Sequence, residues 1–336
     1  MDVHRTVPLP ATAATAATDV PVPSSISAEA QAILSMPRVS PVVFPDLDDI
    51  AGWRQMIAAR DEEMASLLRG MVDEDAADVE RVAVGDATVY KIVPVGCRAD
   101  AARAYLEIHG GALITGGGEC CRITGTMTAL RLGVVTWAVD YRMPPDHPYP
   151  AALDDCLAAY GELVRTFGAA HVVVGGMSAG GNLAAATILR GRDEGLPLPA
   201  AAVLLTPEVD LTESGDSFTT NIGLDNLLTQ RQMPANLLYA GGHDLASPYL
   251  SPLFADFTEG FPPTFLKTGT RDLFLSNTVR LHRALRNAGV PAELHVQEAG
   301  GHAGFFGLAP EDVEIDNELR RFLDGHWGRA PHAKVT

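Results

Sequence analysis

From residue 103 onward, short apolar segments alternate with segments of helical periodicity, and this alternation constrains the fold more than any other feature. The apolar segments do not alternate apolar with polar residues, so both faces of each predicted strand are expected to be buried. Buried strands separated by helices predict an α/β protein with a mostly parallel central sheet covered by helices on both faces. The predicted strands are 103–111, 134–142, 171–176, 200–207, 262–269 and 292–300, and the predicted helices are 150–167, 180–195, 276–289 and 311–323.

Other segments precede and interrupt this alternation. Residues 26–36 and 46–71 have the apolar spacing of helices, and 80–85 and 87–95 are typical of a β-hairpin with a Gly-Asp turn. The first residues are rich in Ala, Thr and Pro, which is typical of a flexible tail. The expected units are a flexible tail in 1–25, cap helices in 26–75, a hydrolase-like core in 76–207 and 261–327, a cap or insertion region in 208–260, and a C-terminal tail in 328–336.

Composition narrows the range of partners and compartments. The formal net charge of −17 disfavours nucleic acid and anionic membranes, since both attract basic surfaces. No apolar run is long enough for a membrane span, and the N-terminus lacks the apolar stretch of a signal peptide. The four cysteines show no zinc-binding spacing and are expected to be reduced thiols. We therefore expect a cytoplasmic protein.

The stretch VVVGGMSAGGN (172–182) places a serine between glycines where an apolar strand gives way to a helix. Gly176-x-Ser178-x-Gly180 in this context is typical of a nucleophile elbow, a sharp turn that lifts the serine hydroxyl above the sheet. The alternative is a polar residue in an ordinary glycine-rich turn, and the pentapeptide alone does not decide between them.

Three other strand ends carry groups that a serine nucleophile needs. One strand ends in His109-Gly110-Gly111-Ala112, a loop able to direct backbone N–H groups at an oxyanion, and two later strands end near Asp272 and His302. The carboxyl ends of parallel strands meet at one edge of a sheet. A serine hydroxyl needs an imidazole to take its proton and a carboxylate to orient that imidazole. The order Ser178, Asp272, His302 therefore predicts a serine hydrolase with a catalytic triad.

The chain resembles the hormone-sensitive-lipase-like group of α/β-hydrolases, the bacterial family IV esterases, from about residue 26 to residue 322. This resemblance implies an α/β-hydrolase fold with a helical cap. It implies a serine carboxylesterase that hydrolyses small to medium esters or lactones through an acyl-serine, with no metal and no cofactor. A homodimer is the assembly expected from the resemblance. The stretches that carry the resemblance are EIHGGALITGG, DYRMPPDHPYPAALDD, GMSAGGNLA, TPEVDLTESGDS and YLSPLFADF, together with the segments around Asp272 and His302.

The resemblance also assigns roles to individual residues. Ser178 is expected to be the nucleophile, His302 the general base and then acid, and Asp272 the carboxylate that orients the imidazole. The backbone N–H groups of Gly111, Ala112 and Ala179 are expected to form the oxyanion hole. Gly110 is expected to shape the oxyanion loop, and His109 to support it.

Three positions depart from the family pattern. Ala112 replaces the last glycine of the family's His-Gly-Gly-Gly sequence, Met177 replaces an acidic residue or threonine before the serine, and Glu208 replaces a tryptophan. These changes bear on substrate preference, with Glu208 expected to make one wall of the site more polar. Two alternative functions stay open: a catalytically silent protein that binds a small molecule, and an acyltransferase.

The remaining motifs of the sequence are interpreted as alternatives to the triad residues or as structural features. Asp244 and Asp210 are the alternatives to Asp272 as the orienting carboxylate. The DYR sequence at 140–142 is expected to contain an ion pair that tethers a loop, and Cys120-Cys121 to pack. The glycines at 116–118 lack the Lys-Ser/Thr of a phosphate-binding loop. In the 46–71 helix, the charge run 60–63 is expected to face solvent, whereas the apolar residues are expected to pack or to line the site as well (Met64, Leu67, Leu68 and Met71).

Overall fold

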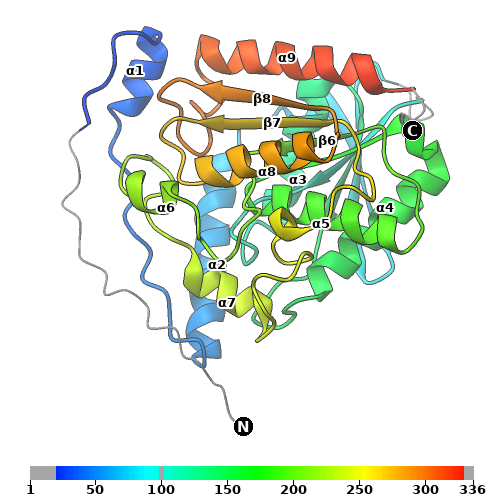
Figure 1. Ribbon diagram of the computed structural model, residues 1–336, viewed down its shortest axis with the longest axis horizontal. Helices are drawn as coiled ribbons and strands as arrows, with labels where there is room; N and C mark the ends of the chain where they lie inside the picture. Colours follow the sequence, from blue (N-terminus) through cyan, green and yellow to red (C-terminus); the bar gives the residue numbers. More distant parts are fainter. Residues whose placement is uncertain (1–19, 98–101, 329–336) are drawn as a thin grey trace.

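The computed structural model describes residues 20–97 and 102–328, which leaves most of the two expected tails outside the described residues. The described strands form one eight-stranded sheet in the order β1-β2-β4-β3-β5-β6-β7-β8 (Figure 1). Pairing is parallel from β4 to β8, and antiparallel between β1 and β2 and between β2 and β4. The mostly parallel sheet predicted from the sequence is confirmed. Its strands are β1 (Ala77–Val84), β2 (Ala87–Pro94), β3 (Ala104–Ile108), β4 (Val135–Asp140), β5 (Val172–Met177), β6 (Ala201–Leu205), β7 (Thr264–Gly269) and β8 (Ala292–Gln297).

The predicted hairpin forms the edge of this sheet. Val84 of β1 pairs with Ala87 of β2, which leaves Gly85 and Asp86 as a two-residue turn. Gly85 has φ 61°, a conformation that glycine adopts without steric cost.

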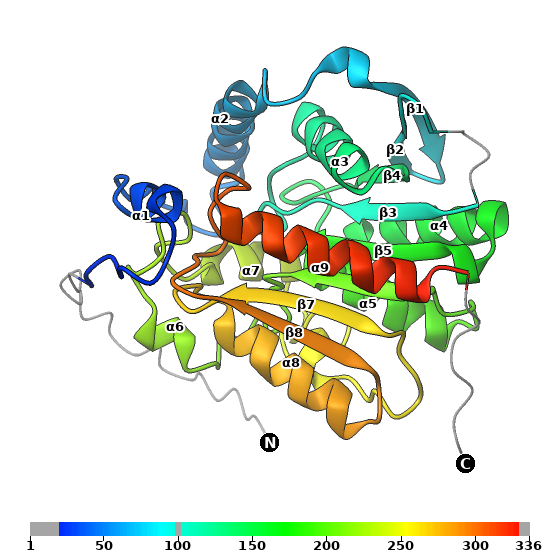
Figure 2. The ribbon, with the colours of Figure 1, turned by 90° about the horizontal axis from the view of Figure 1, so that it is seen from above.

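Helices cover both faces of the sheet (Figure 2). Helices α3 (Glu119–Leu132) and α9 (Pro310–His326) pack on one face, and α4 (Ala151–Phe167), α5 (Ala179–Asp193) and α8 (Leu275–Asn287) pack on the other. No helix within the described part of the chain is long and apolar enough to span a membrane.

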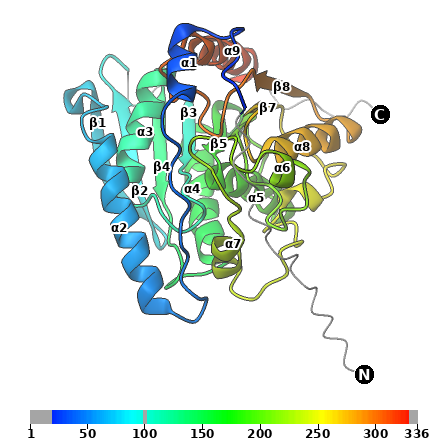
Figure 3. The ribbon, with the colours of Figure 1, turned by 90° about the vertical axis from the view of Figure 1, so that its left-hand side faces the viewer.

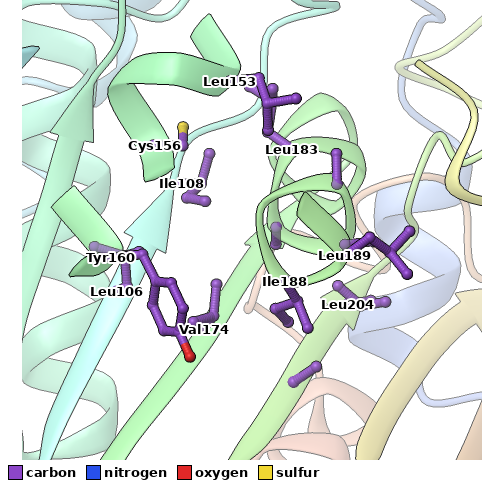
Figure 4. Close-up of a cluster of buried hydrophobic side chains, with 14 of the residues drawn as sticks. Leu106, Ile108, Leu153, Cys156, Tyr160, Val174, Leu183, Ile188, Leu189 and Leu204 are labelled. Atoms are coloured by element: carbon purple, nitrogen blue, oxygen red, sulfur yellow. The ribbon is translucent and has the colours of Figure 1, made fainter. Parts of the chain in front are cut away.

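The two apolar layers explain why the strand sequences are continuously hydrophobic. Successive side chains of a strand point to opposite faces. Leu106 and Ile108 of β3 therefore point toward α4 and α5 (Figure 4), whereas Tyr105 lies in the layer beneath α9. Leu204 of β6 is fully buried in the first layer, where truncation of a leucine to alanine typically costs about 2–5 kcal/mol.

Several helices gather at the end of the sheet toward which the parallel strands point (Figures 2 and 3). Asp49 caps the start of α2 by accepting a hydrogen bond from the Gly52 N–H. The inserted region 208–260 contains α6, α7 and a short 3₁₀ helix, and its assignment to a cap stays a prediction. The helices of this group are α1 (Ala28–Leu34), α2 (Ile50–Leu68), α6 (Ser217–Thr220) and α7 (Met233–Ala240), whereas η3 (Pro252–Phe254) packs against α5 and α8.

One expectation for the long N-terminal helix was wrong, and another holds only in part. Met64, Leu67 and Met71 were expected to pack but are exposed: only one stripe of α2 faces the rest of the molecule, and Met71 lies beyond the end of the helix. The charge run was expected to face solvent, and Glu62 and Glu63 do so. Asp61 instead turns inward, and its Oδ1 accepts a hydrogen bond from the Gly116 N–H at 2.7 Å.

One strand carries an acid in the middle of an apolar layer. Glu107 of β3 lies almost fully buried beneath α3, beside the Thr128 side chain. Burial raises the pKa of Glu107 to about 8, and the charge of Arg131 offsets only part of that effect. The folded protein therefore favours the protonated acid near neutral pH.

We predict that Glu107→Gln becomes more stable relative to the wild type as the pH rises. The folded pKa exceeds that of an unfolded glutamate, so the stability that Glu107 contributes at low pH is lost between about pH 4.5 and pH 8. The difference in unfolding free energy should move in favour of the variant by about 1 kcal/mol per pH unit over that window. Urea unfolding at several pH values measures it. Glu80→Gln, an exposed change on β1, is the control, and parallel curves for Glu107→Gln and wild type would contradict the prediction.

Candidate active site

Ser178 lies in a sharp turn between the end of β5 and the start of α5. Its backbone has φ 60° and ψ −123°, a conformation that L-residues rarely adopt. Hydrogen bonds hold the turn on both sides: the Ser178 N–H donates to Leu205 O at 2.9 Å, and Ser178 O accepts from the Glu208 N–H at 3.2 Å. The strained conformation persists because the neighbouring strand and loop fix it.

Glycines allow strand β3 to approach this turn. A Cβ atom on Gly176 or on Gly180 would lie closer than 3.0 Å to the carbonyl oxygen of Ile108, and one on Gly181 would crowd Pro207. Any larger residue would force apart the backbone segments that carry the serine and the oxyanion loop. The G-x-S-x-G spacing is therefore a packing requirement at this point of the fold.

The loop after β3 also has a strained backbone. Ala112 and Leu113 have φ values of 53° and 65°, which cost about 1–2 kcal/mol for each non-glycine residue. Gly111 has φ 120°, and a Cβ atom there would clash with Thr115 O. The loop closes on Gly111 O, which accepts hydrogen bonds from the backbone N–H groups of Ile114 and Thr115.

These contacts determine where the loop's N–H groups point. In a trans peptide the C=O and N–H groups point in opposite directions. Since Gly111 O faces into the turn, the Ala112 N–H faces out of it. Gly110 O lies 2.7 Å from His109 Nδ1, so the Gly111 N–H points away from the imidazole. Ala179 is the first residue of α5, and its N–H has no acceptor within that helix.

His109 is a buried support of this loop. Its ring stacks on Tyr141 with centroids 4.0 Å apart and planes 7° apart, and the Tyr141 hydroxyl donates to His109 O at 2.9 Å. Burial lowers the pKa of His109, which favours a neutral ring that donates from Nδ1 to Gly110 O. Gly110 is also in contact with the serine turn, because a Cβ atom on it would lie 2.9 Å from Met177 O.

Asp272 and His302 come together at the ends of β7 and β8. His302 Nδ1 lies 3.1 Å from Asp272 Oδ1. The Asp272 carboxylate is fully buried, and it also accepts hydrogen bonds from the Phe274 N–H at 2.9 Å and the Thr268 hydroxyl at 2.8 Å. Phe274 packs edge-on against the imidazole, with centroids 4.9 Å apart. Carboxylate and ring are both held in a single orientation.

Asp225 is a member of the site that the sequence analysis did not identify. It lies in the inserted region, buried, and its Oδ2 accepts a hydrogen bond from the His302 backbone N–H at 2.5 Å. Its Oδ1 accepts from the N–H groups of Leu227 and Leu228 at 2.7 and 3.0 Å. Burial raises the pKa of Asp225 from its ordinary value, and the electrostatic interaction with His302 offsets part of that rise. Asp225 therefore anchors the loop that carries His302.

The alternative carboxylates occupy other environments. Asp244 is exposed, and its carboxylate caps a turn by accepting from the Ala246 N–H. Asp210 is buried but pairs with Arg280 at 2.6 Å. Among the three candidate carboxylates, all within the described residues, Asp272 is the one that contacts the His302 imidazole.

The DYR segment contains the expected ion-paired arginine, but the partner of Arg142 lies outside the segment. Arg142 forms an ion pair with Asp155 at 2.8 Å, whereas Asp140 accepts a hydrogen bond from the Gly118 N–H at 2.9 Å. The glycines at 116–118 thus belong to the support of the oxyanion loop. Cys120 and Cys121 are free, buried thiols, as expected from packing. Residues 20–97 and 102–328 contain no group of three or more acidic, cysteine or histidine side chains suited to a metal ion.

Helices α2 and α7 meet over the oxyanion loop. Trp53 of α2 packs with Ile114 of the loop and with Ala235 and Leu238 of α7, and Ala112 packs against this cluster. The methyl group at position 112 therefore has apolar neighbours from both helices. Glu208, expected in a polar wall, is instead fully buried, and Met177 is partly exposed.

Comparison with known proteins agrees with this geometry. Residues 105–306 match the family model described as the alpha/beta hydrolase fold. The chain is 35% identical to an acetyl-hydrolase of Streptomyces hygroscopicus over 62% of its length and 70% of that protein. It is 31% identical to the esterase LipI of Mycobacterium tuberculosis over 67% of its length and 74% of that protein.

Solved structures extend the similarity to nearly the whole chain. The crystal structure of an esterase, E25, is 36% identical and superposes with a TM-score of 0.84, covering 93% of this chain and 98% of that one. An esterase from the bacterial hormone-sensitive lipase family is 31% identical, with a TM-score of 0.74 over 86% of this chain and 100% of that one. The chain therefore belongs to the α/β-hydrolase family, in the group of bacterial hormone-sensitive-lipase-like esterases.

We predict that Asp225→Asn lowers kcat about tenfold or more with little change in KM. The two carboxylate oxygens of Asp225 together accept hydrogen bonds from three backbone N–H groups, whereas asparagine has a single acceptor oxygen. At least one buried N–H group therefore loses its partner, at a cost of about 1–3 kcal/mol. That cost falls on the loop that positions His302 rather than on substrate contacts. Steady-state ester hydrolysis measures it, with the exposed Asp244→Asn as control. A kcat equal to that of the control would show that the Asp225 contact is dispensable.

Proposed function

We propose that the protein is a serine carboxylesterase in which Ser178, His302 and Asp272 form the catalytic triad. The observation that carries the proposal is the 3.1 Å contact between His302 and the buried Asp272, at the same edge of the sheet as the strained Ser178 turn. The family membership and the names of the relatives support the same activity.

In the proposed reaction, His302 takes the proton of the Ser178 hydroxyl as the oxygen attacks the ester carbonyl carbon. Asp272 fixes the imidazole by its contact with Nδ1 and stabilises the imidazolium that forms. His302 then gives the proton to the departing alcohol, which leaves an acyl-serine. A water molecule, deprotonated by the same imidazole, releases the acid and restores the serine.

The oxyanion formed at each tetrahedral stage is assigned to the N–H groups of Gly111, Ala112 and Ala179. The Gly111 N–H points away from the His109 ring, the Ala112 N–H points out of the turn, and the Ala179 N–H lies at the open start of α5. Donors fixed before the reaction cost no reorganisation, and removing one typically costs about 3 kcal/mol of barrier. The strain at Ala112 and Leu113 is consistent with such preorganisation.

The proposed substrates are small to medium carboxylic esters or lactones. The Ala112 methyl group and the cluster around Trp53 place apolar side chains from α2 and α7 over the oxyanion loop. We infer a preference for short acyl chains, because these side chains occupy space that a long chain would need.

We also propose a cytoplasmic location and a homodimer. The described cysteines are free thiols, which suits a reducing compartment. Fractionation of the cells that make the protein tests the first statement, and light scattering of the purified chain tests the second.

The test of function is hydrolysis of p-nitrophenyl esters from acetate to dodecanoate by the wild type and by Ser178→Ala. Wild type should favour acetate or butyrate, and the variant should lose about 10⁴-fold or more in kcat because the nucleophile is gone. Faster turnover of dodecanoate would contradict the short-chain preference.

The same experiment separates the alternative functions. Fluorophosphonate labelling of Ser178 without turnover of any of these esters would indicate an active site with a specialised substrate. Neither labelling nor turnover would indicate a silent binding protein. Transfer of the acyl group to an added alcohol in preference to water would indicate an acyltransferase.

A further inference from the structure

Glu208 is bonded to the nucleophile turn through its main chain. Its N–H donates to Ser178 O at 3.2 Å, and its carbonyl oxygen accepts from Asn182 Nδ2 at 2.7 Å. Asn182 lies in the first turn of α5 and also donates to Leu250 O at 2.8 Å. The backbone of Glu208 is therefore hydrogen-bonded both to Ser178 and to the first turn of the helix that follows it.

The side chain of Glu208 leads from this turn to helix α7. It is fully buried, and the side-chain amide of Asn236, on α7, lies beside the carboxyl group. Both Glu208 carboxyl oxygens and Asn236 Oδ1 are buried, and none of the three has a hydrogen-bond partner in the part of the chain that the structure describes. A protonated carboxyl group can donate its O–H to this oxygen, whereas an ionised one cannot.

The charged surroundings disfavour ionisation of Glu208. Its acidic neighbours are Glu213 and Asp210, of the same loop region. The nearby cations are engaged by these acids: Arg280 of α8 pairs with Asp210 at 2.6 Å, and Arg231 lies 3.9 Å from Glu213. Helices α5 and α7 contribute the neutral amides of Asn182 and Asn236. Burial, followed by the charge of Glu213, raises the pKa of Glu208 to about 8, and the Asn236 side chain acts in the opposite direction without cancelling the rise.

Helix α7 also reaches the oxyanion loop. Ala235 and Leu238 pack with Trp53 of α2 and with Ile114, in the cluster against which Ala112 packs. Asn236 is thus a residue of the same short helix that contacts the oxyanion loop. A hydrogen bond between Glu208 and Asn236 would therefore connect the Ser178 turn to the helix that contacts the oxyanion loop.

We propose that Glu208 is a positioning residue: its neutral carboxyl group, hydrogen-bonded to Asn236, holds the Ser178 turn and helix α7 in the arrangement that the reaction needs. The inference rests on the proposed esterase function and goes beyond it, because Glu208 touches neither substrate nor the reacting atoms. Ionisation would place an uncompensated charge between α5 and α7 and remove the hydrogen-bond donor. The arrangement, and with it kcat, should therefore be lost as the pH rises through about 8.

The experiment compares Glu208→Gln, Glu208→Leu and Glu213→Gln with wild type, and uses the exposed Glu259→Gln as control. The readout is kcat and KM for p-nitrophenyl butyrate between pH 6 and 9.5. Glutamine has the shape of the neutral acid and can donate to Asn236 at every pH. Glu208→Gln should keep kcat within about threefold of wild type at pH 7 and should lack the decline of wild type above pH 8.

The other two variants should change the profile in different ways. Glu208→Leu fills similar space without a donor, and its kcat should fall about tenfold at pH 7 with KM changed less than twofold. Glu213→Gln removes a neighbouring negative charge, so Glu208 ionises more easily and the alkaline decline should move to lower pH. If Glu208→Leu does not fold, the profiles of Glu208→Gln and Glu213→Gln decide the question.

The proposal is overturned if wild type and Glu208→Gln show the same alkaline decline, or if Glu208→Leu folds and retains the kcat of wild type. Either of these results requires an active enzyme and would therefore leave the proposed esterase function intact. Absence of both turnover and Ser178 labelling in wild type would instead overturn the proposed function, so the two failures are distinguishable.

Discussion

The close approach of strand β3 to the serine turn is the contact on which the rest of the site depends. Ile108 ends β3, and its carbonyl oxygen lies where a Cβ atom on Gly176 or Gly180 would have to be. The oxyanion loop begins at the next residue. One backbone contact thus sets the separation between the proposed nucleophile and the proposed oxyanion donors, and it requires the two glycines of the motif. A parallel sheet supplies this contact because β3 and β5 are neighbouring strands that end at the same edge.

The strained backbone conformations at this edge of the sheet are stabilised by the apolar packing and the hydrogen bonds around them. Ser178, Ala112 and Leu113 all have positive φ values, and conformations of this kind persist only where their surroundings determine them. Leu113 is fully buried, and the turn is closed by hydrogen bonds onto Gly111 O. The apolar layers on both faces of the sheet make the strand ends rigid enough to hold such turns. The core and the site are therefore connected: β3 and β5, which lead into the strained residues, are almost entirely buried.

Local signals predicted much of this arrangement, and contacts between distant segments account for what was missed. Apolar runs and the Gly-Asp turn act over a few residues, so the parallel strands and the hairpin could be read from the sequence. Asp225 meets His302 across 77 residues, and Asp61 meets Gly116 across 55. Neither contact leaves a pattern near the residue itself, because each depends on how the N-terminal helix and the inserted region fold back onto the core. The outward face of α2 was misjudged for the same reason.

The acidic residues of this chain divide into two kinds with opposite physical roles. The chain has 42 Asp and Glu residues against 25 Lys and Arg, and most can stay ionised at the surface. Burial raises the pKa of Glu107 and of Glu208 to about 8, so these two buried acids favour the protonated form near neutral pH. A buried carboxyl group without a cation is costly as an ion but acceptable as a neutral donor. A tryptophan at position 208, as in the family pattern, would fill the space with apolar surface and could offer only its indole N–H as a donor. Glutamic acid instead supplies a small polar contact between two helices, at the cost of making that contact depend on pH.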